Sequence, residues 1–75
     1  MKIYLTKEVT NIVEVEYEIP DDLEDELIAK SIDNNDMGLE DIIYEYGEFI
    51  DETTLDTTYS NVLSLDINNK RYNFY

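Results

Sequence analysis

Apolar and acidic residues alternate strictly over positions 13–19, and a proline follows directly at position 20. A period of two predicts a β-strand over 12–19 that turns one row of side chains to a core and the other to solvent. Proline has no N–H to donate to a sheet, so Pro20 ends the strand. The expected inward row is Val13, Val15, Tyr17 and Ile19, and the expected outward row is Glu14, Glu16 and Glu18.

Similar patterns near both ends of the chain predict two hairpins. Ile3 and Leu5 alternate with more polar neighbours, and a turn near 8–11 would join this strand to the one at 12–19. The alternation over 59–67 is less regular. Asn68 and Asn69 suit a two-residue turn between that segment and a last strand at 70–75.

Between the hairpins, the segment 22–33 has the apolar spacing of an amphipathic helix, with acidic residues on its other side. Asp21 and Asp22 are good N-cap residues, and Asp21 with Glu24 matches a capping box. The apolar residues at helical spacing are Leu23, Leu27, Ile28 and Ile32. Residues 34–38 have the composition of a loop.

The segment 39–52 fits two patterns. Its apolar residues recur at helical spacing, but Gly47 interrupts them, and Ile42, Tyr44 and Tyr46 also alternate as in a strand. Helix is the preferred interpretation, with strand left open over 39–50, and the Thr-rich 53–58 reads as a connection. The predicted fold is a single small α+β domain, 1–75, in ββααββ order: an antiparallel sheet of two hairpins with one or two acidic helices on one face.

The charge of the chain is strongly negative and unevenly placed. It has 19 acidic residues against 5 Lys and Arg, for a net charge of −14. Seventeen of the acidic residues lie between Glu14 and Asp56, and Lys30 is the one cation among them. Phosphates repel such a surface, so direct binding to nucleic acid or to an anionic membrane is excluded. The excess of negative charge favours a partner protein with a positively charged surface.

The residues that most catalytic and metal sites need are missing. The chain has no Cys and no His, which excludes disulfides, thiolate or imidazole metal sites and imidazole acid–base catalysis. A glycosidase-like carboxylate pair needs a cleft that a domain of this size does not provide. The stretch 33–44 resembles a calcium loop only faintly, because Met37 and Tyr44 replace two of its ligands. We therefore expect a cytoplasmic, non-enzymatic protein without catalytic residues, metal or cofactor, and without a membrane span or signal peptide.

The acidic residues of the central region are the candidate site. On a strand, Glu14, Glu16 and Glu18 share a face at intervals of about 6.8 Å, and a duplex carries one phosphate per about 3.4 Å of each strand. Acidic residues of the following segments could raise the carboxylate density toward that value. Tyr44 would be an exposed anchor among them. The further candidates for partner binding are Asp21, Asp22, Asp25, Glu26, Glu40, Asp41, Tyr44, Glu45 and Glu48; the alternative is an ordinary solvated surface.

In length, acidity and lack of catalytic side chains, the chain resembles the small inhibitors that phages and mobile elements direct against host nucleases, such as anti-CRISPR proteins and antirestriction DNA mimics. The resemblance rests on size and charge, without a shared motif. It implies a stoichiometric inhibitor that occupies the nucleic-acid groove of a basic nuclease or Cas effector. An antitoxin or immunity-type protein and an adaptor subunit with a basic protein partner are the alternatives, and both a monomer and a homodimer through a strand edge are left open.

Overall fold

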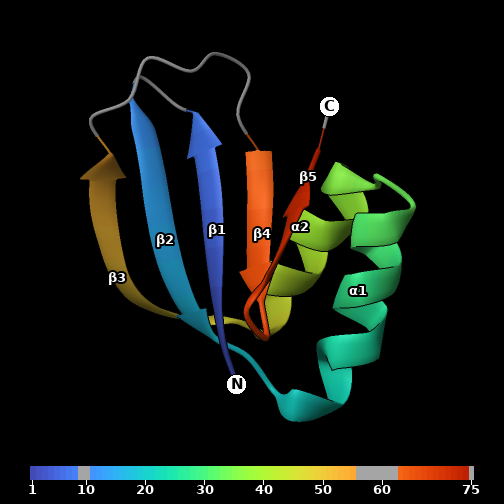
Figure 1. Cartoon of the computed structure of the whole chain (residues 1–75). Helices are drawn as coiled ribbons and strands as arrows, with labels where there is room; N and C mark the ends of the chain where they lie inside the picture. Colours follow the sequence, from blue (N-terminus) through green and yellow to red (C-terminus); the bar gives the residue numbers. More distant parts are fainter. Residues whose placement is uncertain (9–10, 56–62, 75) are drawn as a thin grey trace.

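A five-stranded antiparallel sheet carries two helices on one face (Figure 1). The structure is a computed structural model, and it describes residues 1–8, 11–55 and 63–74. Its elements are β1 (Lys2–Glu8), β2 (Ile12–Glu18), a 3-10 turn η1 (Asp21–Leu23), α1 (Glu24–Ile32), α2 (Asp36–Tyr46), β3 (Glu48–Leu55), β4 (Leu63–Ile67) and β5 (Lys70–Asn73). The strand order is β3-β2-β1-β4-β5. The α+β class is confirmed, but a fifth strand, β3, lies between α2 and the second hairpin, where helix was the preferred interpretation up to position 52 and a connection was expected from 53.

Both predicted hairpins are present. β1 pairs with β2 from Lys2↔Glu18 to Glu8↔Ile12, and β4 pairs with β5. Asn68 and Asn69 have φ values of 51° and 64°, and two successive positive φ values are the signature of the tight turn that matches strand twist. Residues 9–10 of the first predicted turn, 59–62 of the third predicted strand and residue 75 lie outside the described residues.

The first helix begins differently from the prediction. η1 precedes α1, and neither has a side-chain hydrogen bond at its N-cap. The predicted capping role of Asp21 is wrong, because its carboxylate instead accepts a hydrogen bond from the Met1 amine at 2.7 Å. The predicted loop at 34–38 is also too long: Asn35 caps α2 by accepting from the Gly38 N–H at 3.0 Å. Positions 36–38 therefore form the first turn of α2.

Gly47 ends the second helix, so the helix predicted over 39–52 is too long. Its N–H donates to the carbonyl of Ile43 at 2.7 Å, and its backbone is extended at φ −82° and ψ 143°. A Cβ at this position would lie 2.5 Å from the same carbonyl oxygen, so glycine permits the sharp exit. The chain then continues as β3, which contains 53–55 of the predicted connection; the rest of that connection lies outside the described residues.

The core lies between the sheet and the two helices. Ile3 and Leu5 of the central strand β1 are fully buried against Leu65 of β4 and the helical residues Leu27 and Ile43. The inward row of β2 is confirmed, since Val15, Tyr17 and Ile19 are buried and Val13 packs against the core. Four predicted apolar positions are exposed instead: Ile32, Tyr46, Phe49 and Ile50. No helix in the described parts of the chain is long and apolar enough to cross a membrane.

Candidate interaction surfaces

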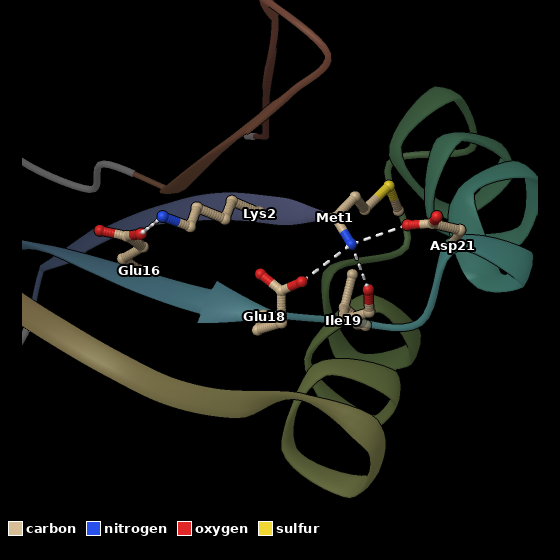
Figure 2. Close-up of polar contacts among 6 residues, drawn as sticks. All are labelled: Met1, Lys2, Glu16, Glu18, Ile19 and Asp21. Atoms are coloured by element: carbon tan, nitrogen blue, oxygen red, sulfur yellow. Dashed lines mark hydrogen bonds and ion pairs between the residues drawn. The ribbon is translucent and has the colours of Figure 1, made fainter.

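The three glutamates of the predicted acidic row lie on the open face of the sheet, on the side away from the helices. This acidic row, Glu14, Glu16 and Glu18, points outward as its alternation predicts. Lys2 of β1 pairs with Glu18 in the sheet, and its Nζ lies 3.5 Å from Glu16 Oε2. The Met1 amine lies 3.3 Å from Glu18 Oε1 (Figure 2). Two members of the row therefore have cationic partners from a strand that precedes them in the chain.

Arg71 of β5 compensates the negative charge on the same face. Its Nε and Nη2 each donate to Asp66 at 3.0 Å, in a two-pronged contact. These hydrogen bonds raise the pKa of the Arg71 guanidinium, and the charge of Glu14 adds to the effect. A shallow pocket of about 570 Å³ lies among Lys2, Tyr4, Glu14 and Asp66. The open face thus carries both signs of charge and is a poor copy of a phosphate backbone.

The Met1 amine joins the sheet to the start of the helical layer. It donates to Glu18 at 3.3 Å, to the carbonyl of Ile19 at 2.7 Å and to Asp21 at 2.7 Å (Figure 2). The hydrogen bond to Asp21 is the main reason why the pKa of this amine lies above its usual value of 8.0. Asp21, a predicted partner-binding residue, is therefore already engaged within the chain.

The raised pKa of the Met1 amine predicts how stability depends on pH. The charged amine stabilises the folded state fully below pH 8, and this contribution is lost as the pH rises through the higher folded-state pKa. We expect the free energy of unfolding, from urea titrations, to fall between pH 7 and pH 9. A chain acetylated at Met1 is the control and should show a flatter profile over that interval. Identical profiles for the two chains would contradict the assignment.

The carboxylates on the helices have a different environment. The helix face is defined by six predicted residues that lie on η1, α1 and α2: Asp22, Asp25, Glu26, Glu40, Asp41 and Glu45. All are exposed except Glu40, which is half-buried. In the part of the chain that the structure describes, none of the six lies within ion-pair distance of a cation. Lys30 is the one basic residue on either helix.

Tyr44 lies at the border between the helix face and the sheet. Its side chain is 52% exposed, its ring packs edge-on against Tyr17 with centroids 6.5 Å apart, and its hydroxyl accepts a hydrogen bond from Lys7 Nζ at 3.1 Å. That bond raises the pKa of the Lys7 ammonium group. Tyr46, the other tyrosine at the end of α2, is also exposed.

Sequence reasoning missed most of the surface formed by β3. Glu48, which was assigned to a helix, begins this strand, and the side chains from Glu48 to Thr54 are all exposed. Phe49 packs edge-on against Tyr17, with ring centroids 6.3 Å apart, so Tyr17 has both Phe49 and Tyr44 as aromatic neighbours. The β-branched residues at 50, 53 and 54 were the available signal for a strand.

The sheet divides the predicted site into two parts. The acidic row lies on one side, and the helix face with Tyr44 lies on the other. One flat partner surface cannot contact both at once. No family model, curated protein or solved structure matches the chain at a significant level, so function has to be argued from the chemistry of these surfaces.

Proposed function

We propose that the chain is a stoichiometric inhibitor whose helix face occupies the basic nucleic-acid groove of a nuclease, such as a CRISPR–Cas effector. The observation that carries the proposal is the contrast between the two faces. The acidic row has cations from Lys2, Arg71 and the Met1 amine nearby. Among the described residues, none of the helix-face carboxylates lies within ion-pair distance of a cation, and Glu40 alone has the charge of Lys7 nearby. A Lys- and Arg-lined groove would supply cationic partners.

The position of one of these carboxylates disfavours folding, which supports a role in binding. Glu45 lies in the last turn of α2, where no basic residue is present. The helix dipole disfavours a negative charge at this end by about 0.3 to 1 kcal/mol. Asp41 precedes Glu45 by four positions, and such a pair repels itself on a helix surface. Stability alone does not account for acidic residues at these places, but attraction to a basic partner does.

The spacing of the carboxylates suits the proposed competitor. Asp41 and Glu45 are separated by about 6 Å along the helix axis, against an axial spacing of about 3.4 Å between phosphates of one DNA strand. α1 carries Asp25 and Glu26, which are also exposed, so both helices contribute carboxylates to the helix face. Fixed charge of this kind accelerates association with a basic surface and makes it sensitive to salt.

A competition experiment tests the proposal. Guide-loaded Cas nucleases and basic restriction endonucleases are each bound to a fluorescent DNA duplex, and the chain is titrated in while anisotropy is followed at 50 and 300 mM NaCl. We expect one of them to release its DNA at a 1:1 ratio of chain to enzyme, with weaker competition at the higher salt. The apparent affinity should fall in proportion to the DNA concentration.

Other outcomes of the same titration would contradict the proposal. If no nuclease releases its DNA, the chain is not an inhibitor of this class. If the chain binds an enzyme that keeps its DNA, an adaptor subunit is the better description. A pull-down from cells would separate the remaining alternative: if it recovers a basic toxin without a DNA groove, the chain is an antitoxin.

A further inference from the structure

The outer edge of β3 is open to a further strand. β3 lies at one end of the sheet and pairs only with β2 in the part of the chain that the structure describes. It has eight residues, and seven of them are exposed. An unpaired edge of this length offers a row of backbone donors and acceptors to another extended chain.

The strand register identifies which backbone groups face outward. Met1 and Ile19 form a mutually hydrogen-bonded pair, with N···O distances of 2.7 and 2.8 Å. In an antiparallel ladder such pairs recur at every second residue, so the odd-numbered residues of β2 bond to β1 and the even-numbered ones bond to β3. Glu14 and Glu16 lie opposite Thr53 and Asp51.

It follows that Asp51 and Thr53 direct their backbone groups toward β2, whereas Glu52 and Thr54 direct theirs away from the sheet. An independent contact agrees with this assignment. The N–H of Glu52 donates to its neighbour's carboxylate, Asp51 Oδ1, at 2.8 Å, which it could not do while bonded to β2. The outward edge therefore begins at Glu52, where an added strand has to replace the Asp51 carboxylate as the acceptor of the N–H, and Thr54 offers the next outward N–H.

The charge on β3 selects the kind of strand that can add to this edge. Glu48, Asp51 and Glu52 are acidic, and β3 contains no basic residue. A second copy of β3 would bring its own three carboxylates against these, and like charges on neighbouring strands are destabilising. A neutral strand would leave Asp51 and Glu52 uncompensated. A basic strand satisfies both the backbone groups and the charges.

Two exposed apolar side chains lie at the start of the same edge. Phe49 is 59% exposed and Ile50 is 42% exposed. Ile50 is the unpaired residue where the register shifts, since Phe49 pairs with Tyr17 and Asp51 with Glu16. A bulge of this kind hinders simple extension of the ladder past that point, so the regular part of the edge runs from Asp51 onward. Phe49 is then available to an apolar side chain.

We infer that the outer edge of β3 binds an extended basic segment of a partner protein as an additional strand. Asp51 and Glu52 point to opposite faces of the sheet, because successive side chains alternate. The segment therefore carries two consecutive Lys or Arg residues opposite them, and an apolar residue near Phe49. The inference rests on the proposed function in taking a basic protein as the partner, and it adds a second contact to the one proposed for the helix face.

A synthetic peptide serves as the probe. It is an eight-residue blocked peptide with two adjacent Arg residues between Val and Thr residues, and its control carries N-methyl groups on alternate backbone nitrogens at the same charge. In amide hydrogen exchange of the labelled chain, we expect the peptide to slow exchange at Glu52 and Thr54, while Asp51 and Thr53 are already protected. The methylated peptide should bind at least tenfold more weakly, because it cannot complete the ladder. Equal binding of the two peptides, or no binding at 50 mM NaCl, would overturn the inference.

Variants of Thr54 provide the second test. Thr54→Pro removes one outward N–H without breaking the ladder to β2, and Thr54→Val keeps that N–H with similar strand propensity. The Pro variant should bind the peptide about tenfold more weakly than the Val variant, with both folded by circular dichroism. Equal affinities would mean that the peptide does not bind to the outward N–H of Thr54. A homodimer held together through Thr54 would mean that the edge binds a second copy of the chain, and either result would overturn the inference. No nuclease is present in these assays, so their failure is distinct from failure of the proposed function.

Discussion

The triple replacement Asp25→Asn, Asp41→Asn and Glu45→Gln is expected to weaken binding to the nuclease found in the competition assay about 100-fold at 50 mM NaCl. All three side chains are exposed on the helix face, and each would lose a charge-assisted contact with a Lys or Arg of the groove. The dissociation constant, measured by biolayer interferometry at several salt concentrations, should also depend less steeply on salt. Folding should survive, because all three side chains are exposed, and the favourable charge lost at Asp25 in the first turn of α1 is offset by the unfavourable charge removed at Glu45 in the last turn of α2.

The acidic row supplies a control of equal charge. Replacing Glu14, Glu16 and Glu18 with Gln also removes three negative charges, so it changes the overall electrostatic attraction by a similar amount. Because this row is on the far side of the sheet and has cationic neighbours, we expect a loss of about fivefold or less. Equal losses in the two variants would mean that net charge alone attracts the partner. A larger loss in the control would place binding on the open face of the sheet.

Local patterns in the sequence were sufficient for the strands whose neighbours are close in the chain. The alternation over 13–19 predicts which side of β2 is buried, and Asn68 with Asn69 predicts the turn of the last hairpin. Both signals depend on the geometry of a few successive residues. They do not depend on which other element packs nearby, and this is why they could be interpreted without a structure.

β3 could not be predicted in the same way, because the apolar residues after position 39 fit a helical period, the preferred interpretation, and in part a strand period as well. What separates the two is Gly47, where a side chain would meet the carbonyl of Ile43, and the pairing of Glu48–Leu55 with β2. That pairing is a contact between segments that are far apart in the chain. A helix ending at Tyr46 and a strand beginning at Glu48 is a combination that neither single pattern describes.

The sequence also did not reveal which cations lie close to the acidic row and offset its charge. Its cations come from Lys2, the Met1 amine and Arg71, which the sheet topology brings to one face. A count of charges along the chain places all three outside the acidic middle. The candidate site consequently has to be divided: the helix face is the surface that we propose for partner binding, and Asp21 is assigned to a contact within the chain.

Leu27 and Ile32 of α1 were predicted on the same apolar stripe, and their replacement by Ala is expected to give very different results. Leu27 is completely buried, whereas Ile32 is 70% exposed at the end of the helix. Leu27→Ala removes buried methyl groups and leaves a cavity, at a cost of about 2 to 5 kcal/mol. A chain of this length has a total stability of about 4 to 11 kcal/mol, so much of the stability would be lost. The measurement is urea unfolding followed by circular dichroism.

Ile32→Ala should change the free energy of unfolding by no more than about 0.5 kcal/mol, as is usual for surface substitutions. The two variants therefore separate the packing of α1 on the sheet from the chemistry of its outer surface. If both destabilise the chain by similar amounts, Ile32 is covered in solution by another part of the chain or by a second copy. If neither does, α1 does not pack on the sheet through Leu27, and the helix face loses the support that holds its carboxylates in one layer.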